Sequence, residues 1–163
     1  MWLFHKTTVL SRSGLLKGMV DCHSHLLPGV DDGVQSMEES LQILREMEQQ
    51  GIRRVWLTPH IMEDIPNETL ALQRKFWELL QQYRGAVELK LAAEYMLDNL
   101  FEERLEKEDL LLLEEGKRFL LVETSYFRWI FCPFCNAFKR KVIILCWHIR
   151  NGMNICRRKT IIL

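Results

Sequence analysis

The sequence predicts an α/β fold made of parallel βα units, the first portion of a barrel in which each strand is followed by a helix. Two observations carry this prediction: segments typical of buried strands alternate with amphipathic segments of helical period, and a glycine follows each of the two longer helical segments. Four strand segments precede residue 127, about half the number in a (β/α)₈ barrel. Because a complete barrel needs about 250 residues, the 163 residues predict a barrel truncated after about four units.

The first unit begins with a short strand at 19–23, followed by a loop over 24–33 that is rich in turn-forming proline and glycine. A helix is expected next. Ser36 and Glu39 have the spacing of a capping box, and Gly51 is positioned to end the helix.

The later units repeat this pattern of strand and helix. In the second helix, either Asn67 or Thr69 is expected to cap the amino terminus. The later elements are expected at 52–58 (strand), 67–85 (helix), 87–94 (strand), 97–105 (helix) and 118–125 (strand).

Charge and cysteine divide the chain near residue 127. The 22 Lys and Arg balance 22 Asp and Glu, which at face value predicts no affinity for nucleic acid or anionic membrane. However, residues 1–127 hold 14 basic and 22 acidic residues, a net charge of −8, whereas 128–163 hold 8 basic residues, no acidic ones and four of the five cysteines. We therefore expect an extension at 1–17, a partial barrel domain at 18–127 and an aberrant basic, cysteine-rich tail at 128–163.

The apolar segments predict a cytoplasmic protein without membrane insertion. The amino-terminal residues lack the continuous apolar core of a signal peptide. The apolar run at 129–138 is too short to span a bilayer. With a single cysteine before residue 127, a disulfide framework is not expected.

Side chains able to bind metal lie at the carboxyl end of every predicted strand. Two histidines stand two residues apart after the first strand, so they project from the same face and can hold one ion. A histidine pair alone is equally typical of a polar loop; the position of the other candidates at the carboxyl ends of strands, where barrels build active sites, favours metal binding. The candidate ligands are His23, His25, Asp32, His60, Glu94 and Glu123.

The donor types indicate a catalytic cluster of divalent metal. Imidazole and carboxylate without thiolate suit manganese, iron or zinc in a catalytic site and disfavour a structural zinc. Glu94 and Glu123 are candidates to bridge two ions. Clustered divalent ions suit the hydrolysis of phosphate esters, because they lower the pKa of a bound water and neutralise charge on the reacting oxygens.

Four sequence blocks resemble the PHP (polymerase and histidinol phosphatase) superfamily, and within it the bacterial manganese-dependent protein-tyrosine phosphatases of capsule and exopolysaccharide loci. They are DCHSHLLPGVDDG at 21–33, TPH at 58–60, AEYM at 93–96 and LLVETSYF at 120–127. The resemblance implies a PHP-type distorted (β/α)₇, TIM-like barrel, up to three Mn²⁺ ions, and dephosphorylation of a tyrosine autokinase that regulates polysaccharide synthesis. It also implies that the six candidates above bind the metal.

Two further acidic residues, Asp21 and Asp31, match the family text and are expected to support the ligands or the fold. The H-P-E-R-like and D-x-H blocks of the family are missing after Phe127. Six ligands cannot complete the coordination spheres of three ions, because each ion binds four to six donor atoms. We therefore expect poor affinity for at least one ion. The tail is expected to be out-of-frame translation. Permitted codons for residues 128–163, read in a frame two bases later, can encode the missing H-P-E-R block.

Several alternatives stay open at this stage. The tail is also compatible with a partner-binding segment or a zinc ribbon, and its short basic runs give a weak case for nucleic acid. A small-molecule phosphatase resembling histidinol phosphatase and a non-catalytic half-barrel are the alternative functions, and homo-oligomerisation is left open. The candidate zinc ligands are Cys132, Cys135, Cys146, His148 and Cys156.

Overall fold

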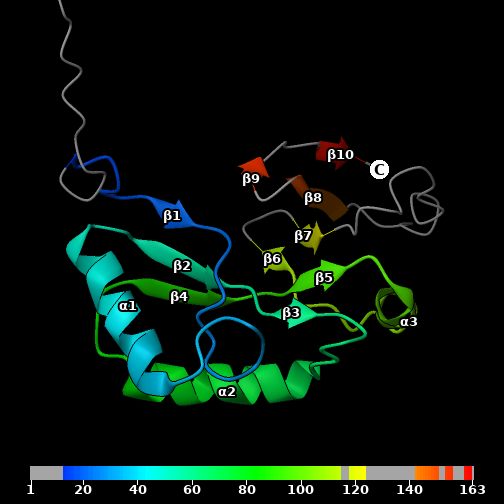
Figure 1. Ribbon diagram of the computed structural model, residues 1–163, viewed down its shortest axis with the longest axis horizontal. Coiled ribbons are helices and arrows are strands. Elements are labelled where there is room, and N and C mark those ends of the chain that lie inside the picture. The colour runs from blue at the N-terminus through cyan, green and yellow to red at the C-terminus, as the bar shows by residue number, and fades with distance from the viewer. Residues whose placement is uncertain (1–12, 115–117, 124–141, 151–152, 156–159, 163) are drawn as a thin grey trace, which may run out of the picture.

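The computed structural model describes residues 13–114, 118–123, 142–150, 153–155 and 160–162. Strands and helices alternate along the chain, as predicted (Figure 1). The elements are β1 (Val20–Asp21), α1 (Met37–Gln49), β2 (Arg54–Leu57), β3 (His60–Ile61), α2 (Thr69–Gln82), β4 (Glu88–Leu91), β5 (Glu94–Met96), α3 (Asn99–Glu106), β6 (Leu113–Glu114), β7 (Arg118–Glu123), β8 (Val142–Arg150), β9 (Met153–Ile155) and β10 (Thr160–Ile162).

The strands form two mainly parallel sheets, which confirms the predicted α/β class. The first sheet has the order β1-β2-β4 and the second β10-β8-β7-β5-β3. Both pairs of the first sheet are parallel, and so are the pairs that join β3, β5, β7 and β8 in the second. Strand β6 pairs antiparallel with β7, and β9 and β10 pair antiparallel with β8.

Two predicted strands are each divided between the two sheets. The chain leaves the first sheet after Leu57 and enters the second at His60, and it repeats this step between Leu91 and Glu94. The expectation that His60 and Glu94 close single strands is therefore wrong, because each begins a second, short strand. Pro59 explains one break, since it has no N–H for the ladder.

Helix α1 begins and ends where the sequence predicts. Ser36 accepts a hydrogen bond from the Glu39 N–H at 3.2 Å, and Gly51 adopts φ of +85° beyond the last turn. The return bond of the capping box is displaced by one residue, because the Glu39 carboxylate accepts from the N–H of Gln35.

Helix α2 begins without a side-chain cap. Its N-cap residue is Glu68, whose side chain makes no capping hydrogen bond, so the expectation that Asn67 or Thr69 caps this helix is wrong. Both side chains have other partners: the Asn67 amide donates to the carbonyls of Val30 and His60, and the Thr69 hydroxyl accepts from Arg104.

The three helices contribute apolar side chains to one core shared with the strands. Helices α1 and α2 lie against the β1-β2-β4 sheet, and α3 lies beyond β5 (Figure 1). Burying apolar side chains on these faces is the main stabilising contribution and holds the strand ends in register. The fully buried residues of this core include Leu27, Leu44, Val55, Leu57, Leu72, Leu79, Tyr95, Phe101, Leu120 and Val122.

The predicted tail contributes three described strands. Strand β8 pairs in parallel with β7, from Arg118 opposite Val142 to Glu123 opposite Trp147. Cys132, Cys135 and Cys156, together with the side chains of Cys146 and His148, lie outside the described residues. The reading-frame expectation is a statement about the coding DNA and stays a prediction. Within the described ranges, no helix is long and apolar enough to cross a membrane.

Candidate metal centre

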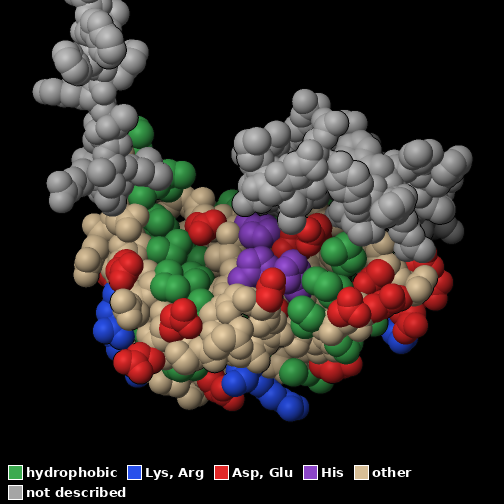
Figure 2. All heavy atoms as spheres, in the orientation of Figure 1, with side chains coloured by type: hydrophobic (Ala, Val, Ile, Leu, Met, Phe, Trp, Pro, Cys, Tyr) green, Lys and Arg blue, Asp and Glu red, His purple; other side chains and the backbone are tan. Residues whose placement is uncertain are grey.

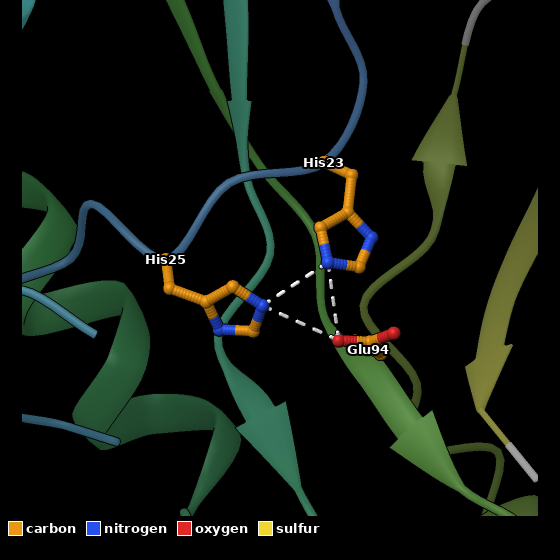
Figure 3. A group of neighbouring side chains, drawn as sticks. All are labelled: His23, His25 and Glu94. Carbon is orange, nitrogen blue, oxygen red and sulfur yellow. Dashed lines mark hydrogen bonds and ion pairs between the residues drawn. The ribbon is translucent and has the colours of Figure 1, made fainter. Parts of the chain in front are cut away.

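The segment from His23 to His25 is held to the end of β2 by the residue between the two histidines. The Ser24 hydroxyl donates to the Trp56 carbonyl at 2.9 Å, and the Ser24 N–H donates to the Thr58 hydroxyl at 3.1 Å. Because Ser24 faces β2, the histidines on either side of it project together towards the second sheet, and Figure 3 shows their rings converging on Glu94.

His23, His25 and Glu94 form a compact triangle of donor atoms (Figure 3). The two Nε2 atoms are 3.1 Å apart, and they lie 3.3 Å and 3.4 Å from Glu94 Oε2. Metal–ligand bonds of about 2.1 Å at angles of about 90–110° place neighbouring ligand atoms about 3.0–3.4 Å apart. The donor atoms therefore fit one face of a metal coordination shell.

His60 and the remaining acidic candidates extend this triangle. His60 Nδ1 lies 3.4 Å from Glu94 Oε2, a contact that lacks the alignment of a hydrogen bond, and His60 Nε2 lies 3.7 Å from Asp32 Oδ1. Within the described chain, donor atoms less than 4.8 Å apart define three groups, each able to hold an ion. They are His23–His25–Glu94, His25–Asp32–His60 and His60–Glu94–Glu123.

The three groups share members, so the fold brings together all six residues predicted from the sequence. His25, His60 and Glu94 each belong to two groups. Glu94 is 3% exposed whereas Asp32 is 77% exposed, so the set runs from the protein interior to the solvent. In Figure 2 the histidine side chains gather in one patch with acidic side chains beside them.

Asp31 supports the centre from behind His25. Its carboxylate accepts three hydrogen bonds, from His25 Nδ1 at 2.8 Å, the His60 N–H at 3.0 Å and the Gly33 N–H at 2.9 Å. With Nδ1 donating to this carboxylate, Nε2 of His25 is left as the metal-binding nitrogen. Asp21 makes a smaller contribution, because among the described residues its carboxylate accepts one hydrogen bond, from the His23 N–H at 3.1 Å.

The carboxylates and imidazoles shift one another's protonation. Burial lowers the pKa of His25, but hydrogen bonds with Asp31 and Glu94 outweigh it and raise that pKa to about 10. Burial raises the pKa of Asp31, but the donors around it outweigh this and bring it below its usual range. Burial lowers the pKa of His23, and burial followed by repulsion from Glu94 raises the pKa of Glu123.

Two residues of the site were missed at the sequence level. The Thr58 hydroxyl holds the histidine segment, as described above, and the Asn67 amide contacts the acidic loop. Thr58 could have been found from its place in the TPH block, whereas Asn67 was interpreted as a helix cap. Gly33 also has a specific role: a Cβ there would lie 2.3 Å from the His25 carbonyl oxygen, so only glycine allows this approach.

Comparison with known proteins relates the chain to bacterial tyrosine phosphatases. It is 36% identical over 115 residues to the tyrosine-protein phosphatase CpsB of Streptococcus pneumoniae, a match that covers 66% of this chain and 45% of that protein. It is 29% identical over 112 residues to the tyrosine-protein phosphatase YwqE of Bacillus subtilis, covering 66% and 44%. The chain thus spans less than half the length of these two relatives.

A solved structure and a family profile agree with these matches. The structure, reported for YwqE and CpsB as metal-dependent tyrosine phosphatases, aligns with a TM-score of 0.62 and 23% identity over 77% of this chain and 54% of that one, which shows a shared fold. The profile of the family described as "Capsular polysaccharide synthesis, CpsB/CapC" matches residues 19–130. The family expected from the sequence blocks is thereby confirmed, and the chain belongs to the CpsB/CapC family of capsular polysaccharide synthesis.

Proposed function

We propose that the six clustered residues bind the divalent metal ions of a phosphoric monoester hydrolase. The observation that carries this proposal is the set of three overlapping donor groups, in which His25, His60 and Glu94 are each shared by two. Glu94, a carboxylate that belongs to two of these groups, can bridge neighbouring ions, which is the arrangement of multinuclear hydrolase sites. Asp31 orients His25, and Asp21 fixes the turn before His23.

The donor chemistry favours manganese, with iron and zinc as alternatives, and up to three ions in a complete barrel. Divalent ions held here would supply the positive charge that favours water attack on a phosphate ester. The protein residues would supply the ligands, imidazole nitrogens and carboxylates, and these bind an ion in their deprotonated forms. Low exposure of Glu94 protects that arrangement from competing water.

The substrate we propose is phosphotyrosine on a bacterial tyrosine autokinase, so that the reaction regulates capsular or exopolysaccharide synthesis in the cytoplasm. Support comes from the names of the two relatives, both tyrosine-protein phosphatases. Since the chain spans less than half of each, we expect the 163-residue protein itself to turn over substrate slowly.

The fold we propose is the first portion of a distorted (β/α)₇, TIM-like barrel. The parallel order of β1, β2 and β4 and the continuation through β3, β5 and β7 support it. In such barrels the ligands belong at the carboxyl ends of strands. His23 and His25 follow β1, and Glu123 is the last residue of β7.

Manganese titration of the 163-residue protein tests this function. Calorimetry of the wild-type chain should detect Mn²⁺ binding, and the H23A/H25A double variant should lose it. Hydrolysis of a phosphotyrosine peptide, measured as released phosphate, should be weak, manganese-dependent and absent in the double variant. Equal manganese binding by both proteins would refute the ligand assignment, and manganese-independent hydrolysis would refute the mechanism.

A further inference from the structure

Asn67 lies between two segments that carry candidate ligands. Its side-chain Nδ2 donates to the carbonyl of Val30 at 2.8 Å and to the carbonyl of His60 at 2.9 Å. Val30 directly precedes Asp31 and Asp32, and His60 is itself a candidate ligand. Because both partners are carbonyl oxygens, only the NH₂ end of the amide can face them, which settles its orientation.

The two hydrogen bonds complete a double connection between the acidic loop and β3. On one side of His60, its backbone N–H donates to the Asp31 carboxylate at 3.0 Å. On the other side, its carbonyl accepts from Asn67, whose second N–H holds Val30 of the same loop. Both peptide groups of His60 are thus bonded within one local network, which restricts the position of its imidazole relative to Asp32.

Arg104 fixes the backbone at Asn67. Its guanidinium, 5% exposed, donates to the Asn67 carbonyl at 2.7 Å and to the Thr69 hydroxyl at 3.2 Å. It is anchored in turn by Asp109 at 2.6 Å. A charged donor bonded to three acceptors is well suited to hold a short connection rigidly, so the Asn67 amide is presented to the loop from a fixed backbone.

We infer that Asn67 is a positioning residue that holds the Asp31–Asp32 loop against His60, with Arg104 fixing it from α3. Its effect on metal affinity rests on the proposed metal centre, whereas its effect on the loop does not. Removing residues that orient metal ligands typically lowers affinity about 10–100-fold, and Asn67 acts through the backbone of the ligand segments, so the lower end is expected.

Hydrogen exchange of the metal-free 163-residue protein, followed by NMR, tests the inference directly. In N67A the amides of His60 and Gly33, which both donate to Asp31, should exchange about tenfold faster than in the wild type. The amide of Ala92, which donates to Leu57 across the first sheet, should be unchanged. N99A is the matched control, because it removes an asparagine bond of 2.6 Å to Glu63 away from the loop, and it should leave all three rates unaltered.

Manganese affinity provides the second readout. We expect it to fall about tenfold in N67A, by a smaller factor in R104K, and to stay within twofold in N99A. N67S keeps a neutral polar side chain with a single donor and cannot bond both carbonyls, so it serves if N67A does not fold. Unchanged exchange at His60 and Gly33 in the folded variant would overturn the inference. Faster exchange without manganese binding by any protein would support it and refute the proposed metal centre instead.

Discussion

The candidate centre has two halves that are positioned in different ways. The loop half, residues 21–33, carries His23, His25 and Asp32 and is held by side-chain hydrogen bonds from Ser24, Asp31 and Asn67. The strand half consists of His60, Glu94 and Glu123, which occupy strand positions: His60 is the register partner of Glu94, and Met96 is the partner of Glu123. Glu94 and Glu123 are positioned by the strand ladder. The loop ligands, and His60 where it meets the loop, depend on a network of supporting polar side chains.

The largest expected effect lies in the strand half, at Glu94. Glu94→Gln keeps the shape but replaces an anionic ligand that is shared by two donor groups. Manganese affinity should fall by about 100-fold or more, since a ligand contributes more than the residues that orient it. Calorimetric titration of the variant beside wild type measures this.

Glu88→Gln is the matched control for that change. Glu88 lies on β4, is exposed, and pairs with Arg54 at 2.6 Å, away from the centre. Its loss of charge should leave manganese affinity within about twofold, in line with the small contribution of exposed ion pairs. If Glu94→Gln and Glu88→Gln bound manganese with the same affinity, Glu94 would not be a ligand, and the strand half would lose its central member.

The next largest effect tests the loop half by crowding it. Gly33→Ala would place a Cβ 2.4 Å from His25 Cβ, so that the loop must move away from the histidine. We expect the free energy of unfolding to fall by about 1–3 kcal/mol, the usual cost of overpacking, and manganese affinity to fall with it. Urea titration and calorimetry measure the two changes.

Gly14→Ala separates crowding from the loss of a glycine. Gly14 has φ of +72° with nothing near its Cβ position, so alanine there strains only the local backbone. It should lower stability without changing manganese affinity. A Gly33→Ala protein with wild-type affinity would show that the contact with His25 does not govern the centre.

The difference between the halves also explains what could be predicted from the sequence. His23 and His25 follow β1 and Glu123 ends β7, and such strand ends are visible as short apolar runs closed by polar residues. His60 and Glu94 instead begin short strands of their own. The breaks after Leu57 and Leu91 were not predicted, because apolar residues stand on both sides of each break and only Pro59 marks a change. Asn67 was interpreted as a cap because a local rule applies to Asn before a helix, whereas its partners lie 7 and 37 residues away.

A smaller effect is expected at Asp31, which supports but does not bind. Asp31→Asn keeps the size of the side chain while removing the charge and one acceptor of the three bonds it receives. The amide has one oxygen and cannot accept at both positions, and His25 loses the negative charge that fixes its tautomer, so manganese affinity should fall about tenfold. Calorimetry measures the affinity, and the ¹⁵N shifts of the His25 ring report the change of tautomer. A variant with an unaltered ring tautomer would contradict the role given to Asp31.

The smallest effect is expected at the other supporting carboxylate, Asp21. Its carboxylate accepts a hydrogen bond from the His23 N–H at 3.1 Å, which an amide oxygen can accept equally well. Burial raises the pKa of Asp21, so its environment favours the uncharged form and an amide fits there without the cost that it brings at Asp31. Asp21→Asn should therefore change manganese affinity by less than about threefold, in the same titration as Asp31→Asn. A loss as large as that of the Asp31 variant would mean that negative charge near the histidines, and not the oriented bond to His25, is what the loop half contributes.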